Sequence, residues 1–138
     1  MKFLRARLIF DPTRPPAWSI VALLSLLVHL LLPTNASEVL AAALLCMIAG
    51  VYFGFATLDG RWSAIFLEGG VACLFVGFAT WALLTNPWLL PFGYLAHAIW
   101  DLLHHSPLFK VTIPTWYIPA CVVVDVAVGL GLWAVWSF

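Results

Sequence analysis

Long apolar runs separated by short polar breaks fill most of the chain. Each run approaches the ~20 residues that an α-helix needs to cross a bilayer, and the breaks contain proline, asparagine, glycine or charged residues. The pattern predicts an all-α fold, an integral membrane bundle of five transmembrane helices that forms a single domain over residues 1–138. The five predicted spans are Ala17–Leu32, Val39–Leu58, Trp62–Leu84, Trp88–His104 and Trp116–Phe138.

The amino-terminal stretch Lys2–Phe10 differs from the five spans because basic and apolar residues alternate along it. It is too short to cross a bilayer, and Asp11 and Pro12 end it. A basic amphipathic segment of this kind lies in the headgroup region rather than across the membrane. We therefore expect a short interfacial helix over residues 2–10.

The composition indicates that lipid surrounds the protein. Hydrophobic residues make up 64% of the chain and charged residues only 9%, with a mean hydropathy of +1.07, whereas soluble domains carry about 25% charged residues. The formal net charge is zero, which argues against nucleic acid as a partner. Membrane lipid is the expected partner instead.

The positions of the basic residues predict an orientation. All six lie before the first span, between the second and third spans, or between the fourth and fifth spans. If the chain crosses the membrane five times, all six are on the same side of it. Because basic loops remain in the cytoplasm, we expect a cytoplasmic amino terminus and an outside carboxyl terminus.

Small residues recur every four positions on three of the spans and suggest close helix packing. Small side chains at that spacing let helix backbones approach one another in lipid. We therefore expect Gly50, Gly69 and Gly77 to face neighbouring helices.

One face of the fourth predicted span is polar. Its titratable side chains fall within roughly 120° of arc when successive residues are placed about 100° apart. Glu68 and Asp125, on two other spans, lie at comparable depth, ~9 and ~14 Å from the cytoplasmic side at 1.5 Å per residue. A carboxylate in lipid costs about 2.5–3.5 kcal/mol, so we expect a common buried site. The residues of the polar face are His97, Asp101, His104 and His105.

Three kinds of chemistry fit these side chains. They could form a hydrogen-bond network that fixes helix register, bind a metal ion, or exchange protons without a metal. In the metal interpretation zinc, iron and manganese are the candidate cofactors, and Glu68 and Asp125 are the catalytic carboxylates. The candidate metal ligands are His97, Asp101, His104 and His105.

The spacing of the polar face resembles a shortened histidine box of membrane fatty-acid hydroxylases and desaturases. Asp101 stands where that pattern has a second histidine, and the chain has four histidines against the eight of that family. The whole chain is more similar to small, uncharacterised bacterial multi-pass membrane proteins, which implies a helical membrane fold in a bacterial plasma (inner) membrane. The residues that carry this likeness are His97, Trp100, Asp101, His104 and His105, followed by Trp116, Tyr117, Pro119, Cys121 and Asp125.

The leading functional prediction is a small integral membrane enzyme that acts on an apolar or lipid-like substrate through this buried site. The alternative is a proton-coupled transporter or an assembly subunit of a membrane complex, in which the same groups relay protons or fix contacts. A single five-helix chain lacks the inverted repeats of many transporters. A homo-oligomer is a candidate assembly, because a second copy could supply the missing repeat.

Overall fold

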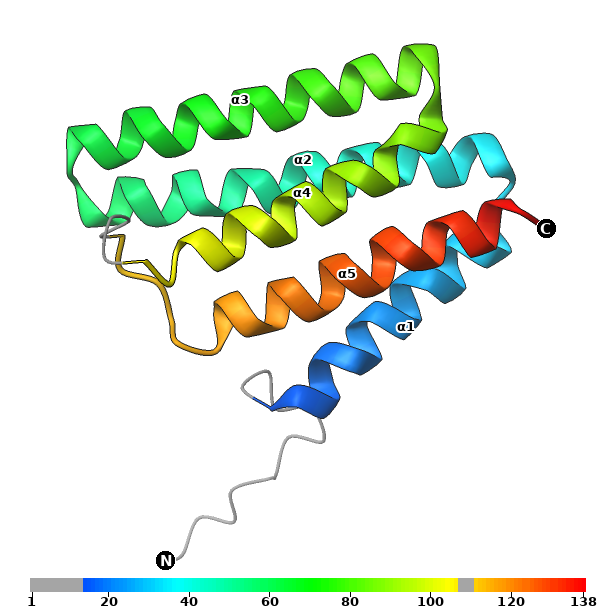
Figure 1. The fold of residues 1–138 in the computed structure, drawn as a ribbon, viewed down its shortest axis with the longest axis horizontal. Coiled ribbons are helices and arrows are strands. Elements are labelled where there is room, and N and C mark those ends of the chain that lie inside the picture. Colours follow the sequence, from blue (N-terminus) through cyan, green and yellow to red (C-terminus); the bar gives the residue numbers. More distant parts are fainter. Residues whose placement is uncertain (1–13, 107–110) are drawn as a thin grey trace, which may run out of the picture.

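The computed structural model describes residues 14–106 and 111–138, and all of the regular structure within these ranges is helical (Figure 1). The all-α prediction is thereby confirmed. The predicted interfacial helix over residues 2–10 lies outside the described residues. The helices are α1 (Pro15–Leu31), α2 (Thr34–Asp59), α3 (Trp62–Thr85), the 3₁₀ helix η1 (Pro87–Leu89), α4 (Leu90–Leu103) and α5 (Tyr117–Trp136).

Three of these helices, α2, α3 and α5, are long and apolar enough to cross a membrane. Helix α1 is apolar but has 17 residues, and the fourth predicted span is divided between η1 and the 14 residues of α4. At the start of this segment the side-chain oxygen of Asn86 accepts a hydrogen bond from the Trp88 amide at 3.2 Å and caps the 3₁₀ turn.

Helix α2 begins at Thr34, five residues earlier than the span predicted from Val39. Polar residues therefore form its first turn, directly after Pro33. The helix ends at Asp59 and is followed by Gly60, whose φ of 77° lies in the left-handed region, a conformation that glycine adopts without the steric cost of a Cβ atom.

Successive long helices run in alternating directions (Figure 1). Helix α2 packs along α3, and α5 packs along both α4 and α1. We call the end of the bundle where α2 and α4 finish and α3 and α5 begin the Arg61 end, and the opposite end the Asn86 end. The described basic residues Arg14 and Arg61 precede α1 and α3, both of which begin at the Arg61 end.

An apolar core fills the half of the bundle toward the Asn86 end. Glycines on α4 and α5 allow the helices to approach there: a Cβ atom on Gly93 would lie 2.5 Å from Leu45 Cδ2, and one on Gly131 would lie 2.5 Å from Leu26 Cδ2. The buried core residues are Ala41, Ala42, Leu45, Ala79, Ala82, Leu90, Tyr94, Val128, Leu132 and Trp136.

The expectation that Gly50 and Gly77 face neighbouring helices is wrong within the described chain. A Cβ atom added at either position would meet nothing within 4 Å, whereas one at Gly69 would lie 3.2 Å from the Phe53 ring. Four-residue spacing identifies a face of small residues but not the neighbour of that face. Among the glycines, an added Cβ atom would come closest to a neighbouring helix at Gly93 and Gly131.

Candidate functional site

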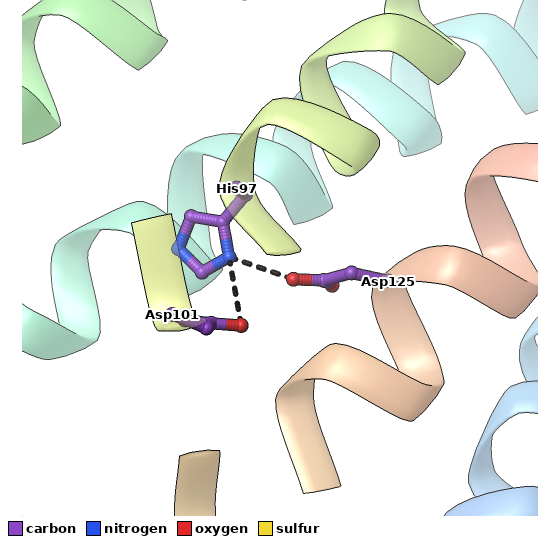
Figure 2. Close-up of side chains that lie close together, drawn as sticks. All are labelled: His97, Asp101 and Asp125. Carbon is purple, nitrogen blue, oxygen red and sulfur yellow. Dashed lines mark hydrogen bonds and ion pairs between the residues drawn. The ribbon is translucent and has the colours of Figure 1, made fainter. Parts of the chain in front are cut away.

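Three titratable side chains form a buried cluster between α4 and α5. Nδ1 of His97 lies 2.7 Å from Oδ2 of Asp125 and 3.6 Å from Oδ2 of Asp101. At most 2% of any of the three side chains is exposed. Figure 2 shows Nδ1 facing both carboxyl groups, with the other ring nitrogen on the opposite side of the imidazole. We call these three residues the His97 cluster.

Local helix geometry explains how this cluster forms. His97 and Asp101 are four residues apart on α4 and therefore share one face. Asp125 lies on α5, one turn before Gly129. A Cβ atom on Gly129 would lie 3.1 Å from the carbonyl oxygen of Pro91, so this glycine allows α5 to approach α4 closely enough for the Asp125 carboxylate to reach His97.

The His97 cluster contains polar atoms that have no hydrogen-bond partner in the described part of the chain. They are both carboxyl oxygens of Asp101 and Nε2 of His97. Buried polar groups normally have partners, because an unsatisfied one costs about 1–3 kcal/mol. Asp101 is therefore the fully buried side chain of the cluster whose hydrogen-bonding capacity the described residues leave unused.

The same three residues also meet the geometric requirement for a metal site. One ligand atom from each of His97, Asp101 and Asp125 can be chosen so that all three lie within 4.8 Å of one another. An imidazole nitrogen and carboxylate oxygens are ligands for zinc, iron and manganese. In a low-dielectric interior, two carboxylates this close can both stay ionised only beside a cation. Otherwise one of them retains a proton.

Glu68 and His104 form a second buried pair, between α3 and the end of α4. Oε1 of Glu68 lies 2.9 Å from Nε2 of His104. The other ring nitrogen, Nδ1, lies 2.9 Å from the backbone oxygen of Trp100, which can only accept, so Nδ1 donates. Both ring nitrogens of His104 therefore have protein partners, and metal coordination would require breaking one of these hydrogen bonds.

Tyr52 of α2 lies between the cluster and the pair. Its ring centroid is 4.3 Å from that of His104 and 5.9 Å from that of His97, and only 1% of the residue is exposed. Its hydroxyl group interacts with the Asp101 carboxyl group, but it has no hydrogen-bond partner of regular geometry within the described ranges. Sequence reasoning missed Tyr52. Its place in the buried stripe Leu45, Ala49, Tyr52 and Ala56 was the available signal.

The six site residues named from the sequence are therefore divided among three environments. His97, Asp101 and Asp125 form the cluster, and Glu68 and His104 form the neighbouring pair. His105 is exposed and belongs to neither group. Helix α4 ends at Leu103 and both histidines lie in the turn that follows, where His104 is buried and His105 is exposed.

A separate polar contact joins three helices near the Asn86 end. The Ser37 hydroxyl oxygen lies 2.8 Å from Nδ1 of His29 and accepts a hydrogen bond from Nε1 of Trp136 at 2.8 Å. These residues belong to α2, α1 and α5, and all three are buried. The contact stabilises the packing of the three helices and lies away from the His97 cluster, beyond the apolar core.

Comparison with known proteins gives no match to a family model, to a curated protein or to a solved structure. Function is therefore inferred from the arrangement of the side chains.

Proposed function

We propose that the chain crosses a membrane five times, with the Arg61 end on the cytoplasmic side of a bacterial plasma membrane. The alternating directions of the helices support this arrangement, as do the apolar surfaces of α2, α3 and α5. Helix α1 and the segment of η1 and α4 each comprise 17 residues, which gives a length of roughly 25 Å at 1.5 Å per residue. Such a helix crosses a slightly thinned bilayer.

Within this bundle, the His97 cluster binds one divalent metal ion. The observation that carries this proposal is Asp101, a fully buried carboxyl group without a hydrogen-bond partner among the described residues, beside His97 and Asp125. A metal ion would neutralise both carboxylates and would replace the proton of the hydrogen bond between His97 and Asp125. A ring proton on Nδ1 would move to Nε2, which has no hydrogen-bond partner among the described residues, and a proton held by either carboxyl group would be released.

The proposed ligands are His97, Asp101 and Asp125, with zinc, iron or manganese as the metal. Three protein ligands leave coordination positions for water or substrate, as in catalytic rather than structural metal sites. This ligand set omits His105, which is exposed, and His104, whose ring nitrogens are occupied by Glu68 and Trp100.

The chemistry of such a site fits an enzyme that acts on an apolar or lipid-like substrate. A bound metal activates water or polarises a substrate oxygen. Glu68 and His104 share one hydrogen-bonded proton outside the ligand set, and this pair is the candidate acid–base group. The surrounding helices have large exposed apolar surfaces, so a substrate dissolved in lipid could approach the site from the membrane.

A metal-free proton site is the second candidate function. It is favoured by the hydrogen bond between His97 and Asp125, which already places a proton at the cluster. In this case Asp101 carries a proton instead of binding metal, and the protein serves as a proton-coupled transporter or assembly subunit. The packed apolar core toward the Asn86 end makes a continuous proton path through one chain less favourable.

Elemental analysis of purified protein, reconstituted in turn with zinc, ferrous iron and manganese, tests the metal proposal. The parent protein is expected to retain one metal per chain. His97→Gln, Asp101→Asn and Asp125→Asn should each lower metal affinity by about tenfold or more, since loss of an outer partner alone costs that much. His105→Gln is the matched control and should retain the metal. A parent protein that retains none of the three metals contradicts the proposal.

A further inference from the structure

Two buried polar groups at the His97 cluster have no hydrogen-bond partner of regular geometry among the described residues. One is the Tyr52 hydroxyl, a hydrogen-bond donor, and the other is the Asp101 carboxyl group, an acceptor when ionised. The two groups interact electrostatically, and the residues are 1% and 0% exposed. A ligand that accepts a hydrogen bond from the Tyr52 hydroxyl group and donates one to the Asp101 carboxylate would give both groups a partner.

A hydroxyl group has this combination of acceptor and donor on one atom. We propose that Tyr52 and Asp101 bind the hydroxyl end of an apolar alcohol, which would make a lipid-like hydroxy compound the substrate class. This inference rests on the proposed function, because it places the substrate oxygen beside the metal ligands. Asp101 has two unpartnered oxygens, one for the metal and one for the hydroxyl group.

The surroundings of Tyr52 suit the apolar part of such a molecule. The Phe55 and Tyr117 rings lie edge-on to Tyr52, with centroids 6.3 and 5.9 Å away, and 5.1 Å from each other. Both residues are half-buried, whereas Tyr52 is buried. Aromatic side chains therefore connect the candidate hydroxyl position to the surface near the Arg61 end, where α2 finishes and α5 begins.

The hydroxyl oxygen could come from water or from an alcohol, and a labelled tyrosine distinguishes the two sources. The chain contains three tyrosines, so protein made with 3-fluorotyrosine gives three fluorine NMR signals. Tyr52→Phe identifies the signal of Tyr52. The probes are 1-dodecanol, dodecyl methyl ether and dodecane, added to protein in micelles of a detergent without hydroxyl groups.

We expect 1-dodecanol to shift the Tyr52 signal in a saturable manner. The ether can accept a hydrogen bond from Tyr52 but cannot donate one to Asp101, so it should bind more weakly than 1-dodecanol and shift the signal less. Dodecane can do neither and should leave the signal in place. Asp101→Leu should weaken dodecanol binding by about tenfold or more, the value of one hydrogen bond to a charged acceptor. Asp59→Leu makes the same change at an acid outside the cluster and should preserve the binding.

Equal shifts from all three probes would show apolar partitioning alone and would overturn the proposal. Absence of a saturable response to dodecanol would mean that water alone, or a direct contact between Tyr52 and Asp101, satisfies the two groups, and would overturn it as well. The metal content of the same samples separates this result from the proposed function. A specific dodecanol shift in protein that binds no metal would contradict the metal site but support the hydroxyl site. Metal binding without a dodecanol shift would support the metal site but contradict the hydroxyl site.

Discussion

His97 and Asp125 connect the two helices that carry the candidate site through a 2.7 Å hydrogen bond between Nδ1 and Oδ2. Both side chains are buried, so the bond also fixes the position of α5 against α4. Asp101 differs, because its carboxyl oxygens have no hydrogen-bond partner within the described residues and lie no closer than 3.6 Å to Nδ1 of His97. The two acids should therefore respond differently to substitution, although both belong to the His97 cluster.

We predict that Asp101→Leu leaves the metal-free protein as stable as the parent or more stable. Leucine removes an unsatisfied buried carboxyl group, whereas Asp125→Leu leaves the His97 imidazole without its partner and should cost about 1–3 kcal/mol. Unfolding of the chelator-treated protein in mixed micelles with increasing SDS measures both changes. Similar destabilisation by the two substitutions would show that Asp101 has a structural partner and no vacant ligand position.

The second buried pair should show strong energetic coupling. Glu68→Leu and His104→Phe each leave a buried polar partner unsatisfied, and the double variant removes both. A double-mutant cycle on the free energy of unfolding should give a coupling of roughly 1–3 kcal/mol, and phenylalanine keeps a ring against Tyr52. Additive effects of the two substitutions would contradict the hydrogen bond between Glu68 and His104.

Two glycines should respond in opposite ways to substitution by alanine. Gly93→Ala places a Cβ atom 2.5 Å from Leu45 and 2.8 Å from Phe78 and should destabilise the protein by about 1–3 kcal/mol. Gly77→Ala meets no neighbouring atom in the described chain and should be neutral, or stabilising by up to about 1 kcal/mol through helix propensity. Thermal unfolding in detergent compares the two variants. Equal destabilisation would mean that Gly77 faces a second protein chain.

The proposed orientation predicts which introduced cysteines react from outside the cell. In a background without the three native cysteines, Asn35→Cys should react with a membrane-impermeant maleimide in intact cells. Lys110→Cys should react only after the membrane is permeabilised, because the loop between the fourth and fifth spans is proposed to be cytoplasmic. Labelling of residue 110 in intact cells would reverse the orientation.

The helices could be predicted from the sequence because long apolar runs leave little choice of backbone structure if they lie in lipid. A membrane-buried backbone must satisfy its hydrogen bonds internally, so long apolar runs predict helices even where tertiary contacts are unknown. The 3₁₀ turn η1 was missed; the Asn86 side chain caps it by accepting a hydrogen bond from the Trp88 amide. Such a local cap does not change the hydropathy pattern.

The site was only partly accessible from the sequence. The spacing of His97 and Asp101 places them on one helix face whatever the fold. In contrast, contact with Asp125 depends on how α5 is rotated against α4, and depth alone does not determine that rotation. The only signal for Tyr52 was its place in a stripe of apolar residues at helical spacing, and its aromatic ring resembles the apolar residues around it. The partner of a small-residue face, as at Gly77, likewise depends on tertiary packing.

X-ray absorption spectroscopy of zinc-loaded protein tests the central claim, that His97, Asp101 and Asp125 hold one metal ion, most directly. We predict a single zinc per chain with nitrogen and oxygen ligands at about 2.0–2.2 Å and no sulfur at about 2.3 Å. One imidazole should contribute to the outer-shell scattering, and this contribution should disappear in His97→Gln but persist in His105→Gln. Zinc surrounded only by oxygen, two or more imidazoles around the metal, or an identical spectrum in His97→Gln would contradict the assignment.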